Sequence, residues 1–289
     1  MAFPPGNPTP LTRLSVADHR RDSAGMTYVY PVVSRRAGGV SVGINLNPNN
    51  ACNWRCIYCQ VPNLRRGGPP PIDLQQLEHE LINFLEWAVV GDFMATRVPE
   101  GNRKIVDIAF SGNGEPTTAK EFTDAVSIVQ ATMIRFSLLG KTQLRLITNG
   151  SMLDRRLVQQ GIASIGRSQG EVWFKLDTIS PAGVTRINGT RASPDTILRR
   201  LKMCATLAPT WLQTCLFELD GKRLPAGDFD LYLKFIQEVR KDIAGIHLYG
   251  IARKPMQNES NRLGRLDRSA LESLADRIRA QGVTVCVNP

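Results

Sequence analysis

The sequence lacks any stretch of about 18 uncharged apolar residues that could span a bilayer. Its first residues, Met-Ala-Phe-Pro-Pro-Gly-Asn-Pro, contain no apolar run of the signal-peptide type. No linker, repeat or low-complexity block divides the 289 residues, and a hydrophobic content of 42% is enough for one large core. We therefore expect a cytoplasmic protein with a single domain and no membrane partner.

Cysteine is also scarce, with six residues in the chain. A reducing compartment keeps thiols free for metal binding or catalysis. Six cysteines in a chain without a secretion signal therefore argue against a disulfide framework. Cys204, Cys215 and Cys286 are scattered singly in apolar helix or strand patterns. We expect these three to be buried structural thiols, which disfavours a second metal cluster.

The other three cysteines, Cys52, Cys56 and Cys59, share the run Cys-Asn-Trp-Arg-Cys-Ile-Tyr-Cys, and the nearest downstream histidine is the distant His79. Electron-transfer clusters take four cysteine ligands, and structural zinc sites are also closed by four ligands. Three thiolates without a nearby fourth ligand favour an iron–sulfur cluster with one iron open to a small molecule. A zinc site completed from elsewhere, or simple packing of thiols, is the alternative.

The spacing Cys-x3-Cys-x2-Cys, with Tyr58 before the last cysteine, resembles the signature of the radical S-adenosylmethionine (radical SAM) enzymes. A second segment, Gly112-Asn113-Gly114-Glu115-Pro116, is similar to the Gly-Gly-Glu-Pro element of that family and departs from it at Asn113. The resemblance implies that the three cysteines hold a [4Fe-4S] cluster and that backbone groups of Gly112 to Glu115 receive the amino group of SAM. Tyr58 would pack near the adenine, unless it is only a core aromatic.

The same resemblance implies a reaction and a partner. An electron from a donor such as flavodoxin or ferredoxin would drive cleavage of SAM to a 5′-deoxyadenosyl radical, which removes a hydrogen atom from the substrate. The cofactor carries the organic chemistry, and the protein supplies orientation and excludes water. A non-catalytic iron–sulfur or RNA-binding protein that has kept the scaffold is the alternative.

Further segments resemble a subgroup related to the wyosine-type tRNA-modifying radical SAM enzymes; these are residues 30–36, 43–48, 59–61, 146–150 and 172–177. The similarity runs from about residue 28 to about residue 255. It implies tRNA or another nucleotide-containing molecule as the substrate, although family membership does not by itself fix a substrate.

The formal charge of +10, from 36 Lys and Arg against 26 Asp and Glu, favours an anionic partner such as RNA or a phosphorylated metabolite. The basic residues form pairs, such as Arg199 and Arg200, and no long stripe. A solvated arginine-rich surface explains the charge equally well.

Short β-rich runs alternate with helical periodicity, which is typical of βα units with a parallel sheet. Strands are predicted at 40–47, 104–111, 143–148, 171–177, 211–219 and 245–251, with a last strand at 283–287 that extends or covers an edge. Asp73 and Ser193 are predicted helix N-caps, and Gly282 a helix stop. We predict an α/β fold with a partial (β/α)6 TIM-like barrel over residues 36–255, preceded by an extension over 1–35 and completed by a helix and strand in 256–289.

In βα barrels, chemistry gathers at the C-terminal ends of the strands, where all these motifs fall. Lys175 and Asp177 end the fourth strand, and a Lys-Asp pair facing a barrel interior is costly unless it binds something, so contact with SAM or substrate is expected. Asn149, which ends the third strand, is a similar candidate, although Asn-Gly is also ordinary turn chemistry. Arg253, after the sixth strand, could bind phosphate. Arg65 and Arg66 are expected to be solvated loop charges.

Overall fold

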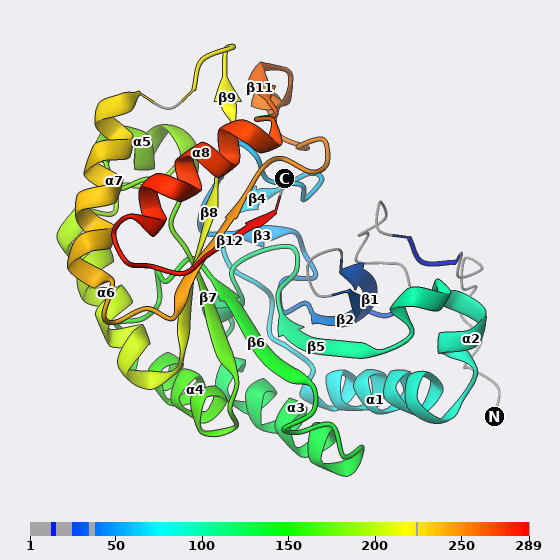
Figure 1. Ribbon diagram of the computed structural model, residues 1–289. Coiled ribbons are helices and arrows are strands. Elements are labelled where there is room, and N and C mark those ends of the chain that lie inside the picture. Colours follow the sequence, from blue (N-terminus) through cyan, green and yellow to red (C-terminus); the bar gives the residue numbers. More distant parts are fainter. Residues whose placement is uncertain (1–12, 16–24, 35–37, 224, 289) are drawn as a thin grey trace.

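The protein is organised around one curved, eight-stranded sheet, shown in Figure 1. The computed structural model describes residues 13–15, 25–34, 38–223 and 225–288. The strand order is β1-β2-β5-β6-β7-β8-β10-β12; β1 runs antiparallel to β2, and all other neighbours are parallel. The strands are β1 (Val29–Ser34), β2 (Gly39–Ile44), β5 (Ile105–Phe110), β6 (Gln143–Thr148), β7 (Glu171–Lys175), β8 (Thr210–Cys215), β10 (Gly245–Tyr249) and β12 (Val285–Asn288).

Six of these strands are each followed by a long helix on the outer face of the sheet (Figure 1). The helices are α1 (Leu74–Leu85), α3 (Phe122–Arg135), α4 (Arg156–Arg167), α6 (Pro194–Leu207), α7 (Ala226–Val239) and α8 (Arg268–Arg279). The predicted partial barrel of six βα units is confirmed. No helix in the described ranges has the length and apolar character needed to cross a membrane.

Shorter elements decorate the rim of the barrel. Two-residue strands pair as β3 (Ala51–Cys52) with β4 (Arg65–Arg66), and as β9 (Glu218–Leu219) with β11 (Leu263–Gly264). The short helices are α2 (Phe93–Arg97), α5 (Pro181–Gly183), the π-helical η1 (Glu86–Val90) and η4 (Val184–Asn188), and the 3₁₀ turns η2 (Glu100–Asn102), η3 (Pro116–Thr118) and η5 (Asn258–Arg262). The β3–β4 pair closes the segment that carries the three cysteines into a compact loop.

The predicted helix boundaries follow local hydrogen bonds. Asp73 accepts a hydrogen bond from the backbone N–H of Gln76 at 2.9 Å, and Ser193 accepts one from the N–H of Thr196 at 3.2 Å. Gly282 follows α8 with a φ of +81°, a conformation that glycine adopts without strain. These three boundary predictions are therefore confirmed, because each rests on chemistry that operates within a few residues.

Two of the longer elements were not predicted. Helix α4 begins without a side-chain cap at Arg155, so the usual start signal is absent. Strand β1 lies in the segment taken as an N-terminal extension, most of which lies outside the described residues. The start of β1 is fixed by the distant Glu80, whose carboxylate accepts the N–H of Tyr28 at 2.7 Å and of Val29 at 3.2 Å. Such a contact cannot be read from local sequence.

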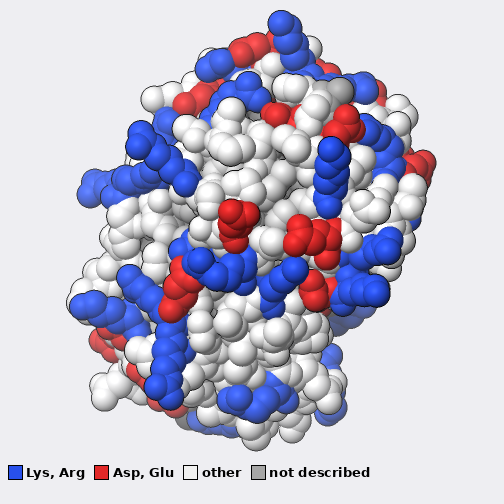
Figure 2. Space-filling view, turned by 90° about the vertical axis from the view of Figure 1, so that its left-hand side faces the viewer, with Lys and Arg blue, Asp and Glu red and all other residues white. Residues whose placement is uncertain are grey.

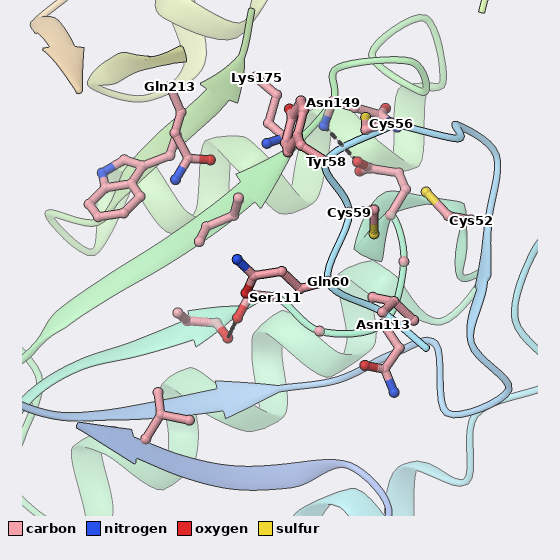
Figure 3. A pocket seen from close by; sticks show the side chains of 18 of the residues that line it. Cys52, Cys56, Tyr58, Cys59, Gln60, Ser111, Asn113, Asn149, Lys175 and Gln213 are labelled. Atoms are coloured by element: carbon pink, nitrogen blue, oxygen red, sulfur yellow. Dashed lines mark hydrogen bonds between the residues drawn. The ribbon is translucent and has the colours of Figure 1, made fainter. Parts of the chain in front are cut away.

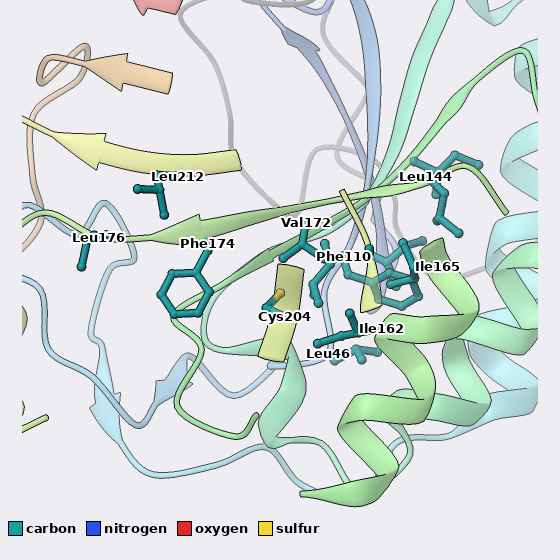
Figure 4. Close-up of a cluster of buried hydrophobic side chains, with 14 of the residues drawn as sticks. Leu46, Phe110, Leu144, Ile162, Ile165, Val172, Phe174, Leu176, Cys204 and Leu212 are labelled. Carbon is teal, nitrogen blue, oxygen red and sulfur yellow. The ribbon is translucent and has the colours of Figure 1, made fainter. Parts of the chain in front are cut away.

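The hydrophobic core lies between the sheet and the outer helices, and Figure 4 shows part of it. Phe110, Leu146 and Val172 come from three adjacent strands and meet Ile162 and Ile165 of α4, all buried. Parallel strands covered by helices bury apolar side chains in near-continuous runs, as seen here. This layer fixes the strand ends that carry the polar residues of the opposite, inner face.

The isolated cysteines follow the prediction only in part. Cys204 is fully buried on α6, and Cys215 is buried at the end of β8. Cys286 is exposed, so the prediction of a third buried thiol is wrong. The reason is its place on the edge strand β12, where neither face is fully covered.

Gly166 marks a close approach of α4 to the end of α6, because a Cβ there would lie 2.2 Å from the carbonyl oxygen of Leu207. We expect Gly166→Ala to lower the free energy of unfolding by about 1–3 kcal/mol through overpacking. The matched control is Gly227→Ala in α7, where a Cβ would meet nothing within 4 Å and should be neutral or stabilise by up to about 1 kcal/mol. Urea unfolding of both variants checks this; equal effects would contradict the proposed contact.

Candidate functional site

A cavity of about 350 Å³ opens at the C-terminal ends of the strands and extends into the barrel (Figure 3). Its wall carries nearly every residue predicted from the motifs: Cys52, Cys56, Tyr58, Cys59, Gly112, Asn113, Gly114, Glu115, Asn149, Lys175 and Arg253. These residues come from loops or strand ends that follow five different strands. The structure thus places these residues together at one rim of the barrel, as predicted. Asp177 is the exception.

The three cysteine thiols of the loop are partly exposed to this cavity. The backbone N–H of Cys59 donates to the carbonyl of Cys56 at 3.0 Å, and the N–H of Trp54 donates to Sγ of Cys52 at 3.4 Å. Burial raises the pKa of Cys52 to about 11 and that of Cys56 to about 12. Without a metal, Cys52 and Cys56 therefore stay protonated, and metal binding must release their protons.

The arrangement fits a cluster better than a single ion. No group of three His, Cys, Asp or Glu side chains in the described ranges is placed to hold one metal ion. In an iron–sulfur cluster each thiolate binds a different iron, so the sulfur atoms need only surround a common volume. Cys52, Cys56 and Cys59 meet that requirement because all three border the same cavity. Cys215 is buried in a hydrophobic cluster against which Cys56 packs, but it does not line the cavity and does not join the three thiols there.

Asparagine side chains hold the cysteine loop against the loop that follows β5. Asn45 accepts the backbone N–H of Asn113 at 3.0 Å, and the side-chain amide of Asn113 donates to Asn50 at 2.7 Å. Asn113 is the residue that departs from the commonest family motif, and here it links the two loops directly. The departure is therefore compatible with an intact site.

The glycines on either side of Asn113 are required by the same loop contact. Gly112 has a φ of +155°, and a Cβ there would lie 2.3 Å from Oδ1 of Asn45. A Cβ on Gly114 would lie 2.0 Å from the carbonyl oxygen of Ala51. Glycine at these positions thus permits close packing of two loops, in addition to leaving backbone groups on the cavity wall.

Glu115 ties the same loop to the end of β6. Its buried carboxylate accepts hydrogen bonds from the hydroxyl of Thr148 at 2.6 Å, the N–H of Asn149 at 2.6 Å, and the N–H of Thr117 at 3.2 Å. Burial raises the pKa of Glu115, and these hydrogen bonds oppose the shift. Because its oxygens are already occupied, this side chain acts within the protein framework. The amide of Asn149 in turn donates to Asn53 in the cysteine loop at 2.9 Å.

Lys175 reaches into the cavity from the end of β7 (Figure 3). Its ammonium lies 3.1 Å from the hydroxyl of Tyr249 and 5.2 Å from the centre of the Tyr58 ring. Burial alone would lower the pKa of Lys175, but Tyr249 and Asp177 raise it above its ordinary range. The group is a fixed cation on the cavity wall.

Asp177 lies behind this wall and does not border the large cavity. Its carboxylate, which is 2% exposed, accepts the hydroxyl of Tyr58, the amide of Asn188 at 2.7 Å and the N–H of Cys215 at 2.9 Å. Asn188 also donates to Sγ of Cys56 at 3.4 Å. Asp177 thereby orients two groups that face the cysteine loop, and its contacts are those of a positioning residue.

The segment after β10 closes over the other side of the cysteine loop. Arg253 donates to the side-chain oxygen of Gln60 at 3.1 Å, and the backbone N–H of Met256 donates to the carbonyl of Cys59 at 2.9 Å. Arg55 forms a two-point ion pair with Glu259, at 3.0 and 3.3 Å. This segment therefore fixes the loop from the far end of the chain.

Arg65 and Arg66, which were expected to be solvated loop charges, are both exposed. Arg66 nevertheless donates to the carbonyl of Asn53 at 2.9 Å. It thus helps to close the cysteine loop. Sequence analysis also missed Asn53, Asn188, Gln60 and Gln213, which touch the loop or line the cavity. Only Gln213 carried a readable signal, since alternation along the predicted strand 211–219 places it on the same face as Cys215.

The fold and site define a class of protein: a parallel partial barrel that gathers three cysteines and a glycine-rich loop around a cofactor-sized cavity. The sequence profile of the Radical SAM superfamily matches residues 46–218. The chain belongs to this superfamily. The family resemblance predicted from the motifs is confirmed.

Comparison with individual proteins supports the same assignment. The GTP 3′,8-cyclase of Mycobacterium sp. (strain KMS) is 27% identical over 209 residues, which covers 69% of this chain and 53% of the relative. A structure of TYW1 with a lysine-pyruvate adduct bound is similar with a TM-score of 0.55 at 16% identity, covering 84% of this chain and 74% of that one. A radical SAM methyltransferase from Sphaerobacter thermophilus reaches a TM-score of 0.62 at 12% identity, covering 90% and 68%. Identities this low show a common fold.

This chain covers between 16% and 53% of the length of the curated relatives that it matches. The likeness therefore concerns only part of those proteins.

The contacts of Asp177 predict a large structural effect. Asp177→Ala leaves a buried hydroxyl, amide and N–H without their acceptor, so we expect the free energy of unfolding to fall by about 3 kcal/mol or more. The control is Asp154→Ala, which removes the exposed partner of Arg199 and Arg200 and should cost less than about 1 kcal/mol. Urea unfolding of the cluster-free proteins measures both. Similar losses in the two variants would argue against the positioning role.

Proposed function

We propose that this protein is a radical SAM enzyme in which Cys52, Cys56 and Cys59 hold a [4Fe-4S] cluster. The observation that carries the proposal is that three partly exposed thiols share one cavity with the glycine-rich loop and Lys175. When bound, the cluster and SAM supply a carbon-centred radical, by one-electron cleavage of SAM, that removes a hydrogen atom from the substrate. The electron comes from a small donor protein such as flavodoxin or ferredoxin.

The residues around the thiols have separate tasks in this proposal. Backbone groups from Gly112 to Glu115 receive the amino group of SAM, because the tight loop leaves main-chain atoms on the cavity wall. Tyr58, held by Asp177, presents its ring to the cavity and packs against the adenine. Asn149 steadies the cysteine loop through Asn53.

Asn188 has a task of its own, since its side-chain amide donates to Sγ of Cys56. Hydrogen bonds to cluster sulfur atoms tune the reduction potential. Lys175 contributes a positive charge near the same thiol and contacts SAM or substrate, and Arg253 binds an anionic part of the substrate at the rim.

Reconstitution tests the central proposal. Anaerobic incubation of the wild type with SAM and dithionite should yield 5′-deoxyadenosine, and Cys56→Ala should reduce the yield to background, because one iron loses its protein ligand. Cys286→Ala, which changes an exposed thiol far from the cavity, should keep full yield.

Two outcomes would contradict this assignment. Full activity of Cys56→Ala would show that the cysteine loop does not hold the cluster. Bound SAM without any 5′-deoxyadenosine from the wild type would favour the alternative of a non-catalytic iron–sulfur protein.

The substrate that we propose is nucleotide-containing, with tRNA as the first candidate. The support is the resemblance to the wyosine-type tRNA-modifying subgroup, the fold shared with TYW1, and a curated relative whose named substrate is GTP. Charge adds less. On the face shown in Figure 2, Lys and Arg are interleaved with Asp and Glu and form no continuous basic stripe. Several of the arginines and lysines in the chain are also paired, as Arg200 is with Asp154 and Lys202 with Glu238.

Mass spectrometry of tRNA nucleosides tests the substrate. Cells that lack the protein should lose one modified nucleoside, or accumulate its precursor, compared with wild-type cells. Complementation with the wild-type gene should restore the profile, and the Cys56→Ala gene should not, because hydrogen abstraction requires the cluster. An unchanged nucleoside profile in the deletion strain would contradict tRNA as the substrate.

A further inference from the structure

The bottom of the barrel is closed by a polar network whose groups satisfy one another. Arg145 pairs with Asp107 on one side and with Glu171 at 2.8 Å on the other. Its guanidinium carbon lies 4.0 Å from the centre of the Trp173 ring, and the indole N–H of Trp173 also donates to Glu171 at 2.8 Å. The side chain of Arg145 is 12% exposed and that of Asp107 is 3% exposed. Each of these groups already has a partner within the network, in which one guanidinium serves two carboxylates, so they form the floor of the cavity.

Next to this floor lie two polar side chains that lack such protein partners among the residues that the structure describes. Lys175 and Gln213 are register partners on the adjacent strands β7 and β8, and both border the cavity. Gln213 is 6% exposed, and its side-chain amide makes no hydrogen bond with any described residue. Lys175 contacts the hydroxyl of Tyr249, but no carboxylate in the described part of the chain forms an ion pair with it.

The nearest carboxylate, Asp177, does not fill this role. Its oxygens accept hydrogen bonds from Tyr58, Asn188 and the backbone of Cys215. An ammonium group in a largely buried position is costly without an anionic partner. The amide of Gln213 borders the cavity, so its donor can reach a ligand there. The pair is therefore suited to a ligand that carries negative charge on adjacent oxygen atoms.

We propose that Lys175 and Gln213 form a subsite for a compact oxyanion of the substrate, a carboxylate or a phosphate group. The Lys175 ammonium supplies the charge-assisted hydrogen bond, and Nε2 of Gln213 donates to a second oxygen of the same group. This inference rests on the proposed function, in which SAM occupies the cysteine end of the cavity.

Position within the cavity separates the subsite from the SAM contacts. Figure 3 shows Cys52, Cys56 and Cys59 on one side, Gln213 on the opposite side, and Lys175 between them. A SAM molecule held by the cysteine loop and by Gly112 to Glu115 can approach Lys175 more readily than Gln213. Gln213 is thus the residue whose substitution distinguishes substrate binding from SAM binding.

The test uses the protein with its cluster oxidised and SAM at saturation. Two methyl-bearing anions, acetate and methyl phosphate, serve as probes, and their binding is followed by saturation-transfer NMR of the methyl protons. Neutral acetamide controls for binding without charge. We expect at least one of the two anions to bind more tightly than acetamide, and the better one identifies the oxyanion that the subsite prefers.

Variants then locate the bound probe. Gln213→Leu keeps the side-chain volume but removes the donor, and should weaken the preferred anion at least tenfold. Gln213→Glu places a carboxylate beside Lys175 and should abolish binding. Arg199→Gln, on the exposed outer surface, should leave the affinity unchanged and so controls for general attraction of anions to a basic protein.

The possible results separate failure of the subsite from failure of the proposed function. Absence of SAM binding in the wild type would count against the function itself. If SAM binds, the subsite is overturned by equal anion affinity in wild type and Gln213→Leu, by no preference over acetamide, or by anion binding that SAM abolishes. The last result would assign Lys175 and Gln213 to the carboxylate of SAM. The comparison of anions with acetamide in the wild type remains informative even if a variant fails to fold.

Discussion

The shape of the cysteine loop depends on hydrogen bonds that neighbouring loops supply. A short loop with three thiols has almost no core of its own, so its conformation must be imposed from outside. Asn113 binds it from the loop after β5, Asn149 from the end of β6, and Asn188 from η4. Side-chain amides suit this task because each can donate and accept at once. The thiol positions are thus set by three separate strand-loop units of the barrel.

Buried carboxylates form the next layer of this support. Glu115 at the cavity wall and Asp177 behind it accept hydrogen bonds from protein groups, while Asp107 pairs with Arg145 at the floor. Each of these acids already accepts hydrogen bonds or pairs with an arginine, so none of them offers an unpaired oxygen to the cavity. Lys175 consequently keeps its charge available to a ligand. The barrel interior is therefore highly polar yet leaves few unmatched groups, and those few coincide with the cavity.

Sequence patterns predicted those parts of the molecule that depend on local chemistry. The cysteine spacing, the caps at Asp73 and Ser193, and the alternation in the barrel strands each involve residues close in the chain. The pairing of Asp177 with Tyr58 and Asn188 was not predicted, because it joins a strand end to two loops that only the folded barrel brings together. For the same reason Lys175 and Asp177, two residues apart, were expected to act together although they face different surroundings.

The position of Gln213 was missed because strand alternation, its one readable signal, gives the face of the strand and not what that face borders. The exposure of Cys286 was missed because an edge strand has the same sequence character as a covered one. Both failures concern what lies opposite a residue in space, which depends on sheet order and on the length of neighbouring elements.

The ion pair between Arg55 and Glu259, together with the contact of Met256 to Cys59, joins the cysteine loop to a segment about two hundred positions later in the chain. During synthesis the early loop emerges from the ribosome long before that segment exists. The three thiols therefore reach their final enclosure only after translation has passed residue 259.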